Sequence, residues 1–346
     1  LIPTLDHGKD LRLAFGSWPT PLVRASRLEG RLGCGPLLVK RDDLSGFAVA
    51  GSKTRPLEYL LGGAVADGHD TLVVGGVATS SFCQGAAVAA RAAGLDCHIV
   101  LPGEPPAPAA ANLALALACG ARVSFSGGPR AELDDRIRDR AAELNRTGRS
   151  AVAVPRGGAS ALGCLGFVRA ARELSDQLAA LGHDRARIVL AVGSGGSIAG
   201  LAVGAGLIGA GWTITGVSVS RPLPELGSHL RALADGCAEL LGVTGPVGFA
   251  PSLLQAPGGR HGEPESSTAE ERAAALLALE TEGLLLDAHY TAPAFAIARR
   301  QLEQEGPPVV FWHTGGLVGA ISAVLTAGID RDAGAAIAAR PDGGRP

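Results

Sequence analysis

The chain has 346 residues, enough for two domains of ordinary size, and 47% of them are apolar although only 4% are aromatic. Its formal net charge is -2 and no long run of one sign occurs, so we expect neither a nucleic-acid partner nor a membrane surface. There is no signal-peptide pattern and no apolar run of about 18 residues, and the six cysteines are scattered without a CxxC pair. We therefore expect a cytoplasmic protein without a membrane helix, a disulfide framework or a bound metal.

The first half of the chain alternates short apolar strands with helices. The segment Trp18-Pro19-Thr20-Pro21-Leu22 is expected to be extended, because each proline biases its predecessor away from helix. The β-branched run at 71–74 predicts a buried parallel strand, and Thr79, Ser80 and Ser81 can cap the helix after it. We predict strands at 37–41, 71–74, 97–101, 121–125 and 151–154, and helices at 56–67, 84–93, 109–119 and 130–147.

The second half repeats this alternation. The region 245–268 is rich in Gly and Pro and is expected to be irregular, and the tail 331–346 is expected to be loose. Strand–helix alternation over most of the chain predicts an α/β fold with parallel sheets. We predict strands at 187–192, 213–219 and 308–313, and helices at 160–181, 198–209, 269–281 and 292–304.

Four of the predicted strands end in small, polar, glycine-rich turns, at 75–81, 156–160, 193–197 and 314–316. Ligands of open parallel sheets bind beyond the carboxyl ends of the strands. The sequence therefore predicts a binding cleft that is assembled from these four turns.

Lys53 stands between a Gly51-Ser52 turn and the start of a predicted helix, and an apolar run at 47–50 precedes it. Burial and the positive end of a helix dipole both disfavour the charged form of an amine. A neutral amine is what Schiff-base chemistry with an aldehyde requires. The alternative interpretation is an ordinary surface lysine near a helix N-terminus.

The turn Gly193-Ser194-Gly195-Gly196-Ser197 lies between a predicted strand and a helix. Successive backbone N–H groups in such a loop can bind an anion, and the helix N-terminus reinforces this. A dinucleotide fingerprint would need glycine where Ile198 stands, and no lysine follows as in a Walker loop. A phosphate is the expected guest, and a glycine turn without a ligand is the alternative.

A reactive lysine together with a single phosphate site points to pyridoxal phosphate as cofactor. The sequence resembles the pyridoxal-phosphate enzymes of the tryptophan-synthase β-like fold, and most closely the group with D-cysteine desulfhydrase and 1-aminocyclopropane-1-carboxylate deaminase. The resemblance covers about residues 10–325. Five motifs carry it in order: Val39-Lys40-Arg41-Asp42-Asp43 with Gly51-Ser52-Lys53-Thr54-Arg55-Pro56-Leu57-Glu58-Tyr59; Asp70-Thr71-Leu72-Val73 with Gly75-Gly76; the turn at 193–200; Glu282-Gly283-Leu284-Leu285-Leu286-Asp287 with Tyr290; and His313-Thr314-Gly315-Gly316.

The resemblance implies two domains, each an open, mostly parallel sheet flanked by helices (fold type II). We expect 1–55 plus 163–330 to form the large, cofactor-binding domain and 56–162 the small one. Lys53 would carry the cofactor as a Schiff base and shuttle protons, and Tyr290 would donate a proton or orient the substrate. Thr291 or Thr314 would bind the pyridine nitrogen, whereas His313 is expected to be a strand-end histidine rather than a catalytic one. The phosphate would be held by Gly193, Ser194, Gly195, Gly196 and Ser197.

The sequence also departs from the group where substrate and cofactor are bound. The group usually has QSNxxRQ after its second strand, and here Thr79 falls at the serine position and Ser80 at the asparagine position. Thr79, Ser80, Ser81, His261 and Tyr290 are expected to face the substrate, with Thr79 among the catalytic residues and Ser80 also at the cofactor. His261 would replace a tyrosine of the group.

The leading hypothesis is a pyridoxal-phosphate-dependent lyase or deaminase that acts on a small amino acid by elimination. The first alternative is a replacement synthase, in which a nucleophile adds after elimination to make a specialised amino acid. A non-catalytic ligand-binding relative is the second. The resemblance further implies a homodimer.

Overall fold

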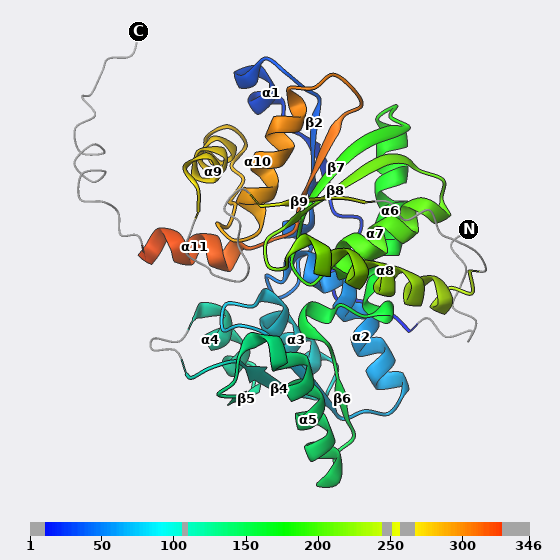
Figure 1. Ribbon diagram of the computed structural model, residues 1–346, viewed down its shortest axis with the longest axis vertical. Helices are drawn as coiled ribbons and strands as arrows, with labels where there is room; N and C mark the ends of the chain where they lie inside the picture. The colour runs from blue at the N-terminus through cyan, green and yellow to red at the C-terminus, as the bar shows by residue number, and fades with distance from the viewer. Residues whose placement is uncertain (1–10, 106–109, 244–250, 257–266, 327–346) are drawn as a thin grey trace.

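Two β-sheets of unequal size organise the chain, and in Figure 1 the smaller sheet lies below the larger. The computed structural model describes residues 11–105, 110–243, 251–256 and 267–326, so the predicted tail and His261 lie outside the described residues. The strand orders are β1-β2-β10-β7-β8-β9 and β5-β4-β3-β6. All paired strands run parallel except β1 and β2, which confirms the predicted α/β fold with mostly parallel sheets.

The strands lie close to the predicted positions. The six-stranded sheet contains β1 (Leu22–Arg24), β2 (Leu37–Arg41), β7 (Arg185–Val192), β8 (Gly211–Ser218), β9 (Ser252–Gln255) and β10 (Val309–His313). The four-stranded sheet contains β3 (Thr71–Gly75), β4 (Asp96–Leu101), β5 (Arg122–Phe125) and β6 (Ala151–Ala153).

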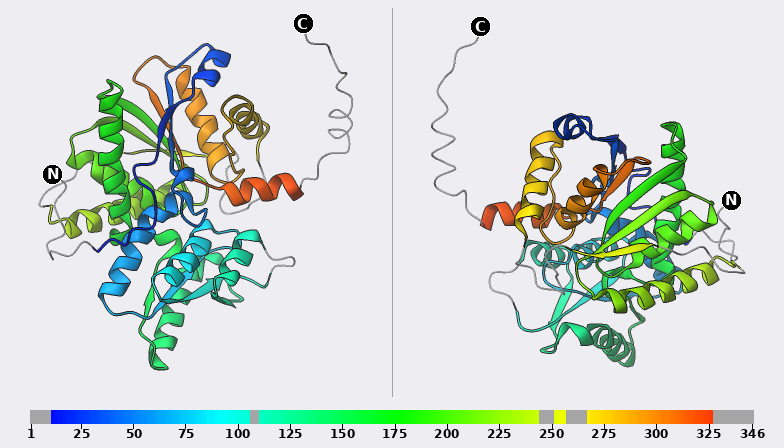
Figure 2. Two further views of the ribbon diagram at one scale, coloured as in Figure 1. Left: turned by 180° about the vertical axis from the view of Figure 1, so that it is seen from behind. Right: turned by 45° about the horizontal axis from the view of Figure 1, so that its top comes forward.

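Helices cover both faces of the six-stranded sheet, as the rotated views in Figure 2 show. Side chains alternate along β7, so Ile188 and Leu190 join one buried cluster while Val189 joins the other. The Ile188 face packs against α6 (Ala161–Ala180), α7 (Gly196–Leu207) and α8 (Leu223–Leu240). The Val189 face packs against α1 (Ser26–Leu32), α9 (Ala269–Glu282) and α10 (Thr291–Leu302). A sheet buried on both faces explains the nearly continuous apolar runs of its central strands.

The four-stranded sheet is covered in the same way. Leu72 and Val74 of β3 pack against α2 (Thr54–Ala66), α3 (Ser81–Ala92) and α4 (Ala111–Ala118). Val73 faces the opposite side and packs against α5 (Leu133–Arg146). All four strands of this sheet fall within the predicted small domain, but the predicted domain boundaries themselves stay a prediction.

One prediction about the chain path was wrong, and four elements were not predicted. The region expected to be irregular contains β9, which pairs with β8, with Thr215 opposite Ser252, and forms one edge of the sheet. A four-residue edge strand has too few residues to show an alternating pattern. The elements β1, α1, α8 and α11 (Leu317–Thr326) also had no prediction. Among the described helices, none combines the length and the apolar character needed to cross a bilayer.

Candidate active site

A cavity of about 460 Å³ opens where strands of both sheets end. Its wall includes Gly75 at the end of β3 and Gly76 after it, Gly157 after β6, Ser194 after β7 and Thr314 after β10. The four glycine-rich turns that were predicted to form a cleft therefore meet in one place.

Lys53 lines this cavity from the last position of the 3-10 helix η2 (Gly51–Lys53), directly before α2. Burial lowers the pKa of the Lys53 amine to about 8. Within the described part of the chain, its Nζ atom has no hydrogen bond or ion pair that would hold the charge. Of the three lysines in the sequence, the buried Lys40 is instead ion-paired with Glu173. Lys53 is thus a lysine whose surroundings favour the neutral amine.

The position of Lys53 depends on a close contact between η2 and the turn after β10. The Ser52 N–H donates a hydrogen bond to the carbonyl oxygen of Thr314 over 2.9 Å. Gly51 has φ +58°, and a Cβ atom at this position would lie 2.4 Å from the same oxygen. Only glycine allows both the left-handed backbone and this approach.

The turn at 193–197 forms the start of α7, with Gly195 at φ +97° before the first helical residue. The N–H groups of a first helical turn have no partner within the helix and can bind an anion. A Cβ atom at Gly157 would lie 2.4 Å from Ser194 Oγ and 3.9 Å from Lys53 Nζ, so the lysine and the turn are neighbours. Gly196 is placed differently from its neighbours, because it packs behind the turn, where a Cβ would lie 3.2 Å from Ala159.

Tyr290 reaches the cavity from the N-terminus of α10, and the Asp287 carboxylate fixes this end of the helix. Asp287 accepts hydrogen bonds from the N–H groups of His289 (3.0 Å), Tyr290 (2.8 Å) and Thr291 (3.1 Å). The Tyr290 ring lies 3.1 Å from the position of a Cβ at Gly193, and 36% of the residue is exposed. Surrounding protein atoms nevertheless raise the pKa of its hydroxyl, which therefore stays protonated at neutral pH.

The two threonines considered for the pyridine nitrogen differ in their surroundings. Thr291 is buried, and its hydroxyl donates to Asp287 Oδ1 over 2.7 Å while accepting from the Asp287 N–H over 2.7 Å. Thr314 lines the cavity. His313 is buried beside Asp43, and burial lowers the pKa of its ring, so it is a neutral strand-end side chain. Because the Thr291 hydroxyl is already engaged by Asp287, the geometry favours Thr314 over Thr291 as a partner for a pyridine nitrogen in the cavity.

The turn after β3 places its three hydroxyl residues unequally. Ser80 and Ser81 line the cavity, and Ser80 Oγ also accepts the Cys83 N–H over 3.2 Å as the cap of α3, as predicted. Thr79 is exposed, and Asn112 Nδ2 donates to its carbonyl oxygen over 2.7 Å. The predicted substrate-facing set therefore divides, with Thr79 outside the wall of the cavity.

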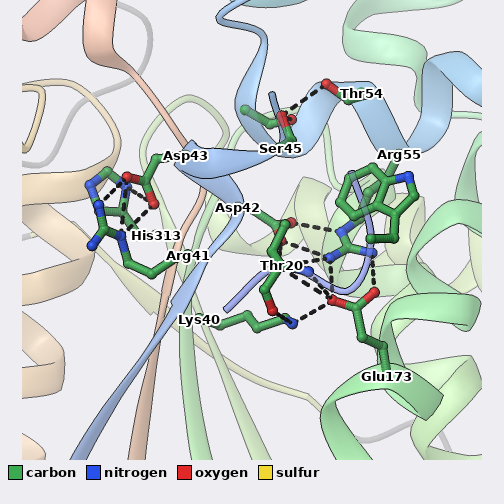
Figure 3. Close-up of polar contacts among 12 residues, drawn as sticks. Thr20, Lys40, Arg41, Asp42, Asp43, Ser45, Thr54, Arg55, Glu173 and His313 are labelled. Atoms are coloured by element: carbon green, nitrogen blue, oxygen red, sulfur yellow. Dashed lines mark hydrogen bonds and ion pairs between the residues drawn. The ribbon is translucent and has the colours of Figure 1, made fainter. Parts of the chain in front are cut away.

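A buried ionic network around Arg55 was not predicted, and Figure 3 shows its geometry. Arg55 donates two hydrogen bonds of 2.7 Å to Asp42 and two of 3.0 Å to Glu173, while Lys40 also donates to Glu173. Although burial alone would raise it, Arg55 holds the pKa of Asp42 below its usual range. Trp18 stacks on the guanidinium, 4.0 Å from ring centroid to Cζ. Because Arg55 lies two residues after Lys53, the network anchors the start of α2.

Three arginines on the cavity wall were also missed by the sequence: Arg130, Arg156 and Arg221. They come from separate segments, and an isolated arginine in a sequence is indistinguishable from a solvated surface charge. The described residues contain no group of three or more His, Cys, Asp or Glu side chains arranged to hold a metal ion.

Comparison with known proteins identifies the family. The sequence pattern of the family described as "Pyridoxal-phosphate dependent enzyme" matches residues 13–315. A Pyrococcus abyssi protein provisionally named 1-aminocyclopropane-1-carboxylate deaminase is 34% identical over 89% of this chain and 92% of its own. The D-cysteine desulfhydrase of Salmonella typhimurium is 33% identical over 88% of this chain and 94% of its own. A protein whose crystal structure is described as that of an ACC (1-aminocyclopropane-1-carboxylate) deaminase homologue is 32% identical, with a TM-score of 0.81. The match covers 90% of this chain and 96% of that one.

These similarities confirm the resemblance that was read from the five motifs, including the fold type, the cofactor and the kinship with lyases and deaminases. They agree with a cavity that brings a lysine of low pKa next to a glycine-rich anion turn. The chain belongs to the family of pyridoxal-phosphate-dependent enzymes.

Proposed function

We propose that this enzyme is a lyase that releases ammonia from a small amino acid, in the manner of the D-cysteine desulfhydrase and 1-aminocyclopropane-1-carboxylate deaminase group. One observation carries the proposal: the Lys53 amine, with a pKa near 8, lies in the same cavity as the turn at 193–197. Gly157 contributes no side chain between them. An aldehyde-reactive amine and an anion site that line one cavity fit the two ends of one small cofactor.

The residues present fit pyridoxal phosphate. When bound, the cofactor supplies an aldehyde for amines and a ring that withdraws electrons from the substrate. The backbone N–H groups and hydroxyls of Gly193, Ser194, Gly195, Gly196 and Ser197 would hold its phosphate. Thr314 would hydrogen-bond the pyridine nitrogen, and a neutral hydroxyl there favours elimination over transamination.

Lys53 and Tyr290 are our candidates for proton transfer. A pKa of about 8 lets the Lys53 Nζ atom both accept and return a proton near neutral pH. Tyr290 carries its proton over the same range, so its Oη atom can donate to a leaving group or orient the substrate. Ser80 and Ser81, which also line the cavity, would bind the substrate carboxylate, and the exposed Thr79 is the weakest candidate of the three.

Product analysis tests this function. Purified enzyme is incubated with D- and L-cysteine, D- and L-serine, and 1-aminocyclopropane-1-carboxylate, and ammonia and 2-oxo acid are measured. We expect both products in equal amounts from at least one of these compounds, and none from Lys53→Met. A product that forms only when a thiol or an amine is added, without 2-oxo acid, would instead identify the replacement synthase that the altered turn at 78–84 suggested.

The same proposal includes a homodimer in a reducing cytoplasm. All six cysteines are free thiols, and four of them are buried. Leu276 and Leu279 of α9 are 55% and 43% exposed, which is compatible with a covered face in an assembly. Light scattering coupled to gel filtration should give twice the mass of the chain, and a monomer mass at working concentration would contradict this part.

A further inference from the structure

Two arginines on the cavity wall, Arg130 and Arg221, have no partner for their charges among the residues that the structure describes. The third arginine of this wall, Arg156, is paired with Asp134. Its Nε and NH2 atoms lie 2.8 Å from Asp134 Oδ2, and its backbone N–H donates to Asp134 Oδ1 over 3.0 Å. Arg130 begins the 3-10 helix η3 (Arg130–Glu132), and Arg221 follows β8. In the part of the chain that the structure describes, neither guanidinium has a hydrogen bond or an ion pair.

The carboxylates nearby do not compensate these charges. Asp287 is 5% exposed, and its oxygens already accept the N–H groups at the start of α10. Glu225 in the first turn of α8 is exposed and forms no ion pair with Arg221. Burial and the neighbouring Arg156 and Arg130 lower the pKa of Arg221, against the opposing effect of Asp134 and Glu225. The cavity therefore has an excess of positive charge at this wall.

The position of the two arginines relates them to Tyr290. Ser220, the residue before Arg221, donates a hydrogen bond from its Oγ atom to the carbonyl oxygen of Gly193 over 3.0 Å. The Tyr290 ring packs against the same glycine. The charge of Arg130 acts on the Tyr290 hydroxyl and partly opposes the rise in its pKa. Arg221 thus follows a residue that is bonded to Gly193, Arg130 acts on the Tyr290 hydroxyl, and all of them line the cavity in which we expect the substrate.

Two other anions of the proposed complex already have binding groups. The cofactor phosphate has the N–H groups and the two hydroxyls of the turn at 193–197. The substrate carboxylate would bind to Ser80 and Ser81, which line the cavity on the turn after β3. Neither anion needs the pair formed by Arg130 and Arg221, and arginine is the side chain best suited to bind a carboxylate or a phosphate group.

We propose that Arg130 and Arg221 form a subsite for a second anionic group of the substrate, so that the enzyme prefers amino acids with a negatively charged side chain. This inference rests on the proposed function in that the substrate is an amino acid. The chemical class is an amino acid whose side chain carries a carboxylate or a phosphate ester, in preference to its neutral counterpart of similar size.

Charge-matched pairs of ligands test the subsite on the holoenzyme. Dissociation constants of aspartate and asparagine, and of O-phosphoserine and serine, in both enantiomers, are obtained from changes in the visible spectrum of the bound cofactor. The variants are Arg130→Gln, Arg221→Gln and the double variant. Arg138→Gln is the matched control, because Arg138 is an exposed arginine of α5 that pairs with Asp135 outside the cavity.

We expect the wild-type enzyme to bind the charged member of at least one pair about tenfold or more tightly, and each substitution to reduce this preference by about tenfold. The control should keep the wild-type ratio. Equal affinities in the wild-type enzyme, or an unchanged ratio in the double variant, would overturn the subsite. If Arg221→Gln instead loosens the cofactor and leaves the ratio unchanged, the arginine serves the phosphate site and the proposal is also overturned.

A second probe separates this inference from the proposed function. Succinate carries two carboxylates and no amino group, so calorimetric titration of the holoenzyme with succinate does not depend on amine chemistry. If no amino acid changes the spectrum, the proposed function fails, and succinate alone then decides on the subsite. Binding that is lost in the double variant and kept in Arg138→Gln would support it, and absence of binding would refute it.

Discussion

The low pKa of Lys53 makes a prediction about stability that requires no knowledge of the substrate. In the cofactor-free protein, Lys53→Met removes the amine that lines the cavity and keeps a flexible apolar side chain of similar length. A lowering of the pKa from 10.5 to about 8, at about 1.4 kcal/mol per pKa unit, corresponds to a destabilisation of about 3 kcal/mol by the charged amine. We therefore expect Lys53→Met to be more stable than the wild-type protein at pH 7.

The sign of the pH dependence follows from proton linkage. Below about pH 8 the amine is protonated in both states, so the folded protein carries the full cost of the buried charge. Between about pH 8 and 10.5 the unfolded chain binds more protons than the folded protein at this residue, so stability rises with pH. By pH 9.5 the wild-type protein should regain about 2 kcal/mol relative to Lys53→Met.

Urea denaturation of both cofactor-free proteins at pH 7 and pH 9.5 measures this difference. All other titrating groups are common to the two proteins, so their contributions cancel in the comparison, as does any pH-independent packing effect of methionine. Stability curves that run parallel between pH 7 and pH 9.5 would show that the Lys53 amine is not desolvated, and the argument for its lowered pKa would fail.

Three further substitutions test how the site is held. Asp287→Asn should lower the free energy of unfolding by about 1–2 kcal/mol and lower kcat, because the amide is a weaker acceptor for the N–H groups of α10. Equal urea midpoints of the variant and the wild-type protein would count against this. Gly51→Ala should cost more than about 2 kcal/mol and weaken cofactor retention, whereas Gly68→Ala, with φ +73° and open space around it, should cost about 1 kcal/mol. Glu173→Gln should lower the free energy of unfolding by about 3–5 kcal/mol, because it leaves the buried Lys40 and Arg55 without their full counter-charge. Glu143→Gln, at an exposed ion pair, should change it by no more than about 0.5 kcal/mol, and similar losses for both variants would contradict the network.

The sequence could indicate those parts of the site that local pattern determines. Lys53 lies between an apolar run and a helix start, and the turn at 193–197 lies between a strand and a helix. The neighbouring residues in the sequence were therefore enough to predict a role for each. The meeting of four strand-end turns followed from the general rule for parallel sheets. These features needed no knowledge of which distant residues touch.

The remaining features depend on contacts between distant segments. Arg55 meets Glu173 across 118 residues of sequence, and nothing near either residue indicates that the other is its partner. Thr291 could not be separated from Thr314 until Asp287 was seen to occupy the Thr291 hydroxyl. A shared role for Arg130 and Arg221 can be inferred only because both line the same cavity. Long-range pairing of charges is what the sequence pattern could not supply.

Reduction with borohydride tests the central claim, that Lys53 binds the cofactor, most directly. The reagent converts a Schiff base into a stable secondary amine, and with three lysines in the sequence the labelled peptide is readily assigned by mass spectrometry. We predict that the peptide containing Lys53 carries the reduced cofactor, and that Lys53→Met shows neither the label nor the visible absorption of the wild-type protein. A label on Lys40 or Lys9, or a visible band that survives in Lys53→Met, would contradict the account.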